Sequence, residues 1–166
     1  MVVIGIDPGS AIVGYAILKT SPQNKQKIET IDFGCITTEC GLPAGDRLKT
    51  IHKELSKLID KHKPNLMSVE SLYFFKNLKT VMPVSQAKGV ILLCASEKRV
   101  PVLEFTPLQV KMAVVGYGRA EKKQVQEMIK KILDISKFNL KENNRKKDDA
   151  TDALGVALCG VWKSWG

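Results

Sequence analysis

The sequence begins with Met1-Val2-Val3-Ile4-Gly5-Ile6-Asp7-Pro8-Gly9-Ser10, and our prediction of the fold starts from these residues. Residues 2–6 have the composition of a buried strand, and Asp-Pro-Gly is favourable turn chemistry. The strand therefore ends at Asp7 and presents this carboxylate at its carboxyl end, where α/β sheets place their functional sites. Asp7 is the first candidate site residue, and a simple turn former is the alternative interpretation.

Further strands extend the predicted sheet. The β-rich runs 13–18 and 27–37 follow turn signals, so the first third of the chain predicts an antiparallel meander. Strands at 66–70 and 100–105 alternate with helical segments, which is typical of parallel pairing. We predict an α/β fold in which three antiparallel strands are extended by parallel strands into a mixed five-stranded sheet flanked by helices.

The helices are predicted from apolar residues that recur at helical spacing and from flanking prolines and glycines. They cover the segment from Pro43 to Pro64 and residues 84–98, 107–115, 121–133 and 149–163. The stretch 134–147 is polar and basic, and its composition predicts the least order. A chain of 166 residues with 44% apolar content can close one hydrophobic core, so we expect a single domain over residues 1–166.

The charge balance favours a polyanionic partner. Lys and Arg number 26 against 17 Asp and Glu, which gives a net charge of +9. Nucleic acid is the first candidate, and a basic but inert surface is the alternative. The four cysteines form no Cys-x-x-Cys pair, so a zinc site is not expected. Because no apolar run approaches the roughly 20 residues that span a bilayer, we expect a soluble, cytoplasmic protein without membrane contact.

Three more carboxylates join Asp7 as candidates. Glu70 ends the predicted strand 66–70, as Asp7 ends the first. Asp149 and Asp152 lie three residues apart at the start of a predicted helix, which puts both on one face with Cβ atoms roughly 5 to 6 Å apart. Helix capping could explain one aspartate. Capping explains poorly why three acids, Asp148, Asp149 and Asp152, lie within five residues, because like charges crowd one another without a counter-cation.

These acids predict a metal centre. Converging carboxylates suit Mg²⁺, with Mn²⁺ as a second choice, because both ions prefer oxygen ligands and are often shared with substrate phosphates. Two such ions per site can activate a water and stabilise the leaving oxygen of a phosphodiester. The sequence therefore indicates metal-assisted phosphodiester hydrolysis without a nucleophilic side chain.

With these residues in place, the chain resembles the RuvC family of bacterial Holliday-junction resolvases, which have the ribonuclease H-like (RNase H-like) fold. The resemblance covers nearly the whole chain. It is carried by Gly5-Ile6-Asp7-Pro8-Gly9-Ser10 with Gly14-Tyr15, Val69-Glu70 before an aromatic loop and Lys76-Asn77, Ser85-Gln86-Ala87-Lys88-Gly89-Val90, Gln109-Val110-Lys111, Ala120-Glu121-Lys122, and Asp149-Ala150-Thr151-Asp152-Ala153-Leu154. Each motif is weak alone, but six in order at compatible spacing are a specific signal.

The resemblance implies an RNase H-like nuclease that forms a homodimer and resolves four-way DNA junctions by paired symmetric nicks during recombination and repair. It also implies RuvA and RuvB as partner proteins. It assigns metal binding to Asp7, Glu70, Asp149 and Asp152, and catalytic roles to Lys111 and Lys122. We expect DNA contacts from Tyr73, Phe74, Lys76, Asn77, Lys111, Arg119 and Lys122. A core or dimer patch is the alternative for the aromatic residues 73–75.

Asp148 precedes Asp149, so the carboxylate pair could be shifted by one residue, although the motif favours Asp149. The basic stretch 134–147 could be a DNA-binding arm. Competing functions are a sugar-kinase-like phosphotransferase, which would need a second lobe, a nuclease for RNA in an RNA/DNA hybrid, and a catalytically silent junction-binding module, against which the four intact acids argue.

Overall fold

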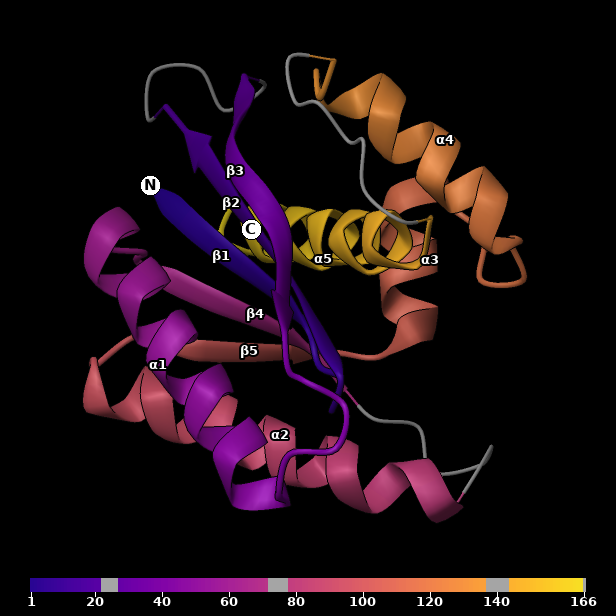
Figure 1. Ribbon diagram of the computed structural model, residues 1–166. Coiled ribbons are helices and arrows are strands. Elements are labelled where there is room, and N and C mark those ends of the chain that lie inside the picture. The colour runs from indigo at the N-terminus through magenta and orange to yellow at the C-terminus, as the bar shows by residue number, and fades with distance from the viewer. Residues whose placement is uncertain (22–26, 72–77, 137–143, 166) are drawn as a thin grey trace.

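A computed structural model describes residues 1–21, 27–71, 78–136 and 144–165. In this part of the chain, a mixed five-stranded sheet in the order β3-β2-β1-β4-β5 has helices on both faces (Figure 1). The elements are β1 (Val2–Asp7), β2 (Ile12–Thr20), β3 (Ile28–Thr37), α1 (Ala44–His62), β4 (Leu66–Glu70), α2 (Leu78–Glu97), β5 (Val102–Phe105), α3 (Pro107–Val115), α4 (Lys122–Ile132) and α5 (Asn144–Lys163). The predicted α/β sheet is confirmed.

Strand β1 lies at the centre of the sheet, and the first candidate acid, Asp7, is at the carboxyl end of this strand. It pairs antiparallel with β2, where Asp7 lies opposite Gly14, and parallel with β4, where Ile6 lies opposite Val69. Because parallel strands end at the same edge, Asp7 and Glu70 come to lie at the ends of neighbouring strands. The strand pairing thus brings together two acids that are separated by 63 positions in the chain.

Alternation along β1 supplies both layers of the core. Ile4 and Ile6 pack on one face with residues of α1 and α2, whereas Val3 packs on the other with residues of α5. Figure 1 shows this division, with α1 and α2 on one side of the sheet and α3, α4 and α5 on the other. Helix α5 lies directly across the central strands.

Glycines let α5 approach the sheet closely. A Cβ atom at Gly5 would overlap backbone atoms of Ala153 and Ala157, and one at Gly14 would overlap the backbone of Asp149. Both glycines lie on the strands that α5 crosses. At these two positions the helix backbone therefore rests directly on the strand backbone.

Two helices begin earlier than their sequence patterns predict. Helix α2 starts at Leu78 and continues through Pro83, whereas the sequence pattern placed the start of this helix after the proline. Helix α5 starts at Asn144, within the stretch 134–147 that was predicted to be the least ordered. Asp149 therefore lies in the second turn of the helix, so its predicted position at the helix start is wrong and it cannot be the N-cap. Within the described segments, no helix has the length and apolar character that a membrane span requires.

Candidate metal centre

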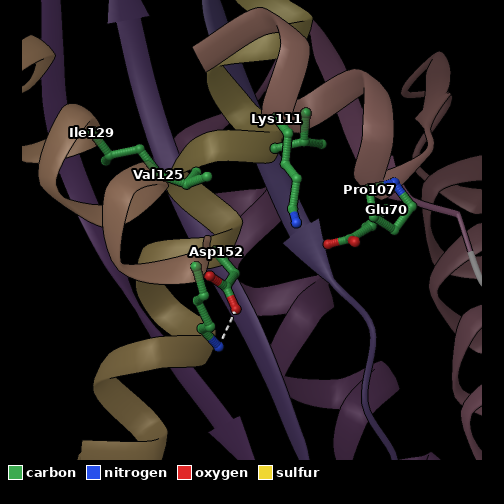
Figure 2. Close-up of a pocket in the computed structure, with 8 residues that line it drawn as sticks. Glu70, Pro107, Lys111, Val125, Ile129 and Asp152 are labelled. Atoms are coloured by element: carbon green, nitrogen blue, oxygen red, sulfur yellow. Dashed lines mark ion pairs between the residues drawn. The ribbon is translucent and has the colours of Figure 1, made fainter. Parts of the chain in front are cut away.

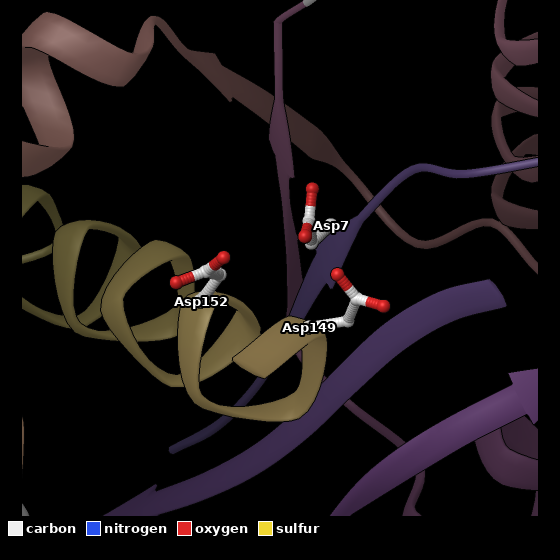
Figure 3. Close-up of side chains that lie close together, drawn as sticks. All are labelled: Asp7, Asp149 and Asp152. Atoms are coloured by element: carbon white, nitrogen blue, oxygen red, sulfur yellow. The ribbon is translucent and has the colours of Figure 1, made fainter. Parts of the chain in front are cut away.

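Three of the predicted acids form a cluster where β1 ends against α5. Asp7, Asp149 and Asp152 each offer a carboxylate oxygen, and these oxygens all lie within 4.8 Å of one another. Figure 3 shows the strand end and one face of the helix directing the three side chains toward a shared space. All three are partly exposed, so an ion from solvent can reach them.

Glu70 stands beside this cluster and faces a cleft. The cleft has a volume of about 260 Å³, and its lining includes Glu70, Asp152, Lys111 and Lys122 together with Val110, Val125 and Ile129. Figure 2 shows the Lys111 ammonium and the Glu70 carboxylate pointing toward each other across it. The lining of the cleft therefore combines charges of both signs with apolar side chains.

The carboxylates are electrostatically crowded. Burial, followed by the charges of Glu70, Asp152 and Asp149, raises the pKa of Asp7 well above its ordinary value. Burial and then the charge of Asp152 raise the pKa of Glu70 to about 7, although Lys122 and Lys111 act in the opposite direction. Burial also raises the pKa of Asp152. These acids would be more stable as carboxylates beside a cation.

The donor set fits a hard divalent ion. Asp7, Asp149, Asp152 and the neighbouring Glu70 supply only carboxylate oxygens, which are the ligands that Mg²⁺ and Mn²⁺ prefer. A bound cation would also offset the burial and the mutual repulsion that raise the pKa values of Asp7, Glu70 and Asp152. Both the chemistry and the electrostatics of the site therefore suit the predicted metal.

Lys122 links the acids of α5 to helix α4. Its Nζ lies 2.7 Å from Oδ2 of Asp152 and 3.8 Å from Oδ2 of Asp148. Burial alone would lower the pKa of Lys122, but the hydrogen bond and charge of Asp152 raise it on balance. Asp148 faces α4, where Gln126 Nε2 donates to its Oδ1 at 3.0 Å. The three-acid cluster contains Asp149 and not Asp148, as the motif favoured.

Capping boxes fix the helices that carry the two lysines. At the start of α3, the Thr106 hydroxyl accepts from the Gln109 backbone and the Gln109 side chain accepts from the Thr106 backbone. Glu121 and Gln124 form the corresponding box at the start of α4. Because Lys111 and Lys122 follow these caps within two turns, their directions are set locally.

Arg47 is a supporting residue that the sequence pattern did not single out. From α1 it donates to the Ser10 carbonyl oxygen at 2.5 Å and to the Thr38 hydroxyl at 3.0 Å, and Thr38 itself donates to Ser10. These bonds hold the turn that follows Asp7. An arginine in an amphipathic helix gives no local signal of such a contact, since its partners lie 37 and 9 positions away.

The remaining predicted DNA contacts are only partly located. Arg119 lies exposed in the connection between α3 and α4. Tyr73, Phe74, Lys76 and Asn77 lie outside the described residues.

A family comparison identifies the kind of protein to which this site belongs. A profile described as "Crossover junction endodeoxyribonuclease RuvC" matches residues 3–160. The chain belongs to the RuvC family. The RuvC protein of Finegoldia magna is 49% identical over 99% of this chain and 94% of its own length. That of Halothermothrix orenii is 47% identical over 96% and 91%.

Solved RuvC structures confirm the predicted RNase H-like fold. T. thermophilus RuvC in complex with a Holliday junction substrate matches with a TM-score of 0.86 and 29% identity, over 99% of this chain and 94% of that chain. A further Thermus thermophilus RuvC structure gives a TM-score of 0.84 at 30% identity, over 100% and 97%. The likeness therefore includes all five strands and the helix that carries Asp149 and Asp152.

Proposed function

We propose that this RuvC-family chain is an endodeoxyribonuclease that resolves four-way DNA junctions by paired symmetric nicks, in recombination and DNA repair. The main support for this proposal is that carboxylate oxygens of Asp7, Asp149 and Asp152 lie within 4.8 Å of one another in a chain that matches the family over residues 3–160. The T. thermophilus relative with the same fold was solved with a Holliday junction substrate.

The proposed reaction depends on a divalent metal. Asp7, Asp149, Asp152 and Glu70 would hold Mg²⁺, or Mn²⁺, as two ions per site. When bound, such ions supply an activated water and stabilise the leaving oxygen of the phosphodiester. Burial and mutual repulsion raise the pKa values of Asp7, Glu70 and Asp152, which supports a role for these carboxylates as cation ligands.

The two lysines would act on the phosphate. Lys111 lines the cleft opposite Glu70, and Lys122 lines it beside Asp152. A fixed ammonium near a scissile phosphate stabilises the negative charge that develops in the transition state. Tyr73, Phe74, Lys76, Asn77 and Arg119 are proposed to contact the junction around this site, and the net charge of +9 would attract its backbone.

A homodimer is part of the proposal, because symmetric nicks require two matched sites. The exposed face of α2 is the surface that we propose for it. Met82 is 67% exposed and Leu93 is 53% exposed, and these two apolar residues lie three helical turns apart on the same helix. By family membership, RuvA and RuvB are the proposed partners, and the cytoplasm, which holds bacterial chromosomal DNA, is the proposed place of action.

The test is nicking of a synthetic four-way junction with Mg²⁺ and with a chelator. We expect cleavage with Mg²⁺, loss of cleavage in the chelator, and recovery when Mg²⁺ is restored. Undiminished cleavage in the chelator would contradict the proposed metal dependence.

A further inference from the structure

Helices α4 and α5 face each other through two pairs of polar side chains, each pair spaced by one helical turn. Lys122 and Gln126 come from α4, and Asp148 and Asp152 come from α5. Lys122 approaches both aspartates, at 2.7 Å from Asp152 and 3.8 Å from Asp148. Gln126 donates to the second oxygen of Asp148 at 3.0 Å. The four side chains form one connected network.

The ion pair between Lys122 and Asp148 is too exposed to serve mainly for stability. The Lys122 side chain is 53% exposed and that of Asp148 is 46% exposed. An ion pair between groups this exposed contributes only about 0 to 1 kcal/mol to folding. Asp148 also lies outside the cluster of Asp7, Asp149 and Asp152. Its contacts therefore have a local consequence, which is the position of the Lys122 ammonium.

Lys122 and a metal ion would compete for the same carboxylate. The ammonium hydrogen-bonds to Asp152 at 2.7 Å, so a cation that binds this oxygen removes the nearest acceptor of Lys122 and repels its charge. A lysine on an exposed helix turn would then move out into solvent. Asp148 offers the ammonium a second acceptor only 3.8 Å away, and Gln126 holds its other oxygen.

We infer that Asp148 and Gln126 are positioning residues: Gln126 orients the Asp148 carboxylate, and Asp148 retains the Lys122 ammonium beside the acidic cluster when a metal ion binds Asp152. The inference rests on the proposed function, in which Asp152 is a metal ligand. Asp148 acts through Lys122 and does not itself bind the metal.

A double-mutant cycle in metal affinity tests this coupling. The affinity of the DNA-free protein for Mn²⁺ is measured by calorimetry in four proteins: wild type, Asp148→Asn, Lys122→Met and the double variant. Because Asp148→Asn leaves Asp152 as the sole acceptor for the ammonium, it should weaken Mn²⁺ binding about tenfold where Lys122 is present. In the Lys122→Met background, the same change should weaken binding less than about threefold. Equal weakening in both backgrounds would overturn the inference, because Asp148 would then act on the metal directly.

Matched variants separate the coupling from charge and folding effects. Glu127→Gln removes one negative charge from an exposed position next to Gln126 and should leave Mn²⁺ affinity within about twofold. Gln126→Leu should reproduce the direction of Asp148→Asn, and Asp148→Glu, which keeps the carboxylate, should restore most of the affinity. In junction nicking, Asp148→Asn should lower kcat with KM unchanged; a change in KM alone would contradict a role through Lys122.

A wrong assignment of the metal ligands would give a different pattern of Mn²⁺ binding. Asp152→Asn should remove most of the Mn²⁺ binding. If wild type binds no Mn²⁺, or if Asp152→Asn binds as well as wild type, the proposed metal ligands are wrong and the positioning role falls with them. If Asp152→Asn loses binding while Asp148→Asn matches wild type, only the positioning role is contradicted.

Discussion

Gly14 lies against the backbone of Asp149, so closely that a Cβ atom at Gly14 would overlap the Asp149 carbonyl oxygen. The same glycine is the strand partner of Asp7. Gly14 therefore sets the distance between the two elements that bear the acidic cluster, since β1 supplies Asp7 and α5 supplies Asp149. A residue without a side chain thus controls the spacing of three carboxylates.

Gly14→Ala should disturb both stability and activity. The added methyl must push α5 away from the sheet, which costs about 1 to 3 kcal/mol as other overpacked substitutions do. The displacement also separates Asp149 from Asp7, so junction nicking should fall at least tenfold. Urea unfolding and a nicking assay measure the two effects. Gly45→Ala is the control, because nothing lies within 4 Å of a Cβ there; equal behaviour of the two variants would contradict the close packing.

Asp7→Asn should abolish cleavage while leaving junction binding largely intact. The substitution keeps the shape of the side chain but removes the charge that faces Asp149 and Asp152. Cleavage with Mg²⁺ and gel-shift binding in a chelator are measured on the same junction. A variant that nicks at the wild-type rate would show that Asp7 holds no essential metal.

The raised pKa of Glu70 predicts how pH affects the metal-free protein. Its pKa is about 7 in the folded protein against an ordinary value of 4.5, so the folded state binds more protons than the unfolded state between these values. By linkage, the contribution of Glu70 to stability falls as pH rises from about 4.5 to 7 and stays low above 7. In a chelator, the melting temperature of wild type should therefore fall relative to that of Glu70→Gln over this range.

The stabilisation of the protein by Mg²⁺ should also depend on pH. Since protons compete with the metal for the carboxylates, the rise in melting temperature on adding Mg²⁺ should grow between pH 6 and 8. In the chelator, a melting-temperature difference between wild type and Glu70→Gln that stays the same at every pH would contradict the raised pKa of Glu70.

Lys111→Ala should slow nicking about 10²- to 10³-fold if this ammonium stabilises charge at the phosphate, as the loss of other transition-state donors does. The reason is its position in the cleft, opposite Glu70. Lys57→Ala removes the same charge from α1, where Lys57 pairs with Glu54 on the surface, and should change the rate less than twofold. The nicking rates of the two variants are compared in single-turnover experiments with the enzyme at a saturating concentration. Equal slowing by both variants would reduce the role of Lys111 to general attraction of DNA.

The sheet and the acids were predictable because their signals are local. The apolar run before Asp7 and the one before Glu70 indicate two strands whose ends carry acids, and the strand register then brings these ends together. The spacing of Asp149 and Asp152 correctly predicted that both face one side of a helix.

The sequence did not predict features that arise between distant segments. Helix α5 begins at Asn144, although its polar first turn has no apolar periodicity that would predict a helix. Gln126 and Asp148, which join two helices, are 22 positions apart in the sequence, and Arg47 and Ser10 are 37 positions apart. Neither contact leaves a periodic or motif signal, since each depends on how helices pack.

The most direct measurement compares three substrates under one condition. A synthetic four-way junction, a linear duplex of the same sequence and an RNA/DNA hybrid are incubated with the protein and Mg²⁺, and the products are mapped on each strand. Paired nicks at symmetric positions, confined to the four-way junction, are expected. Cleavage of the linear duplex at a similar rate, or cleavage of the RNA strand of the hybrid with the junction left intact, would contradict the proposed function.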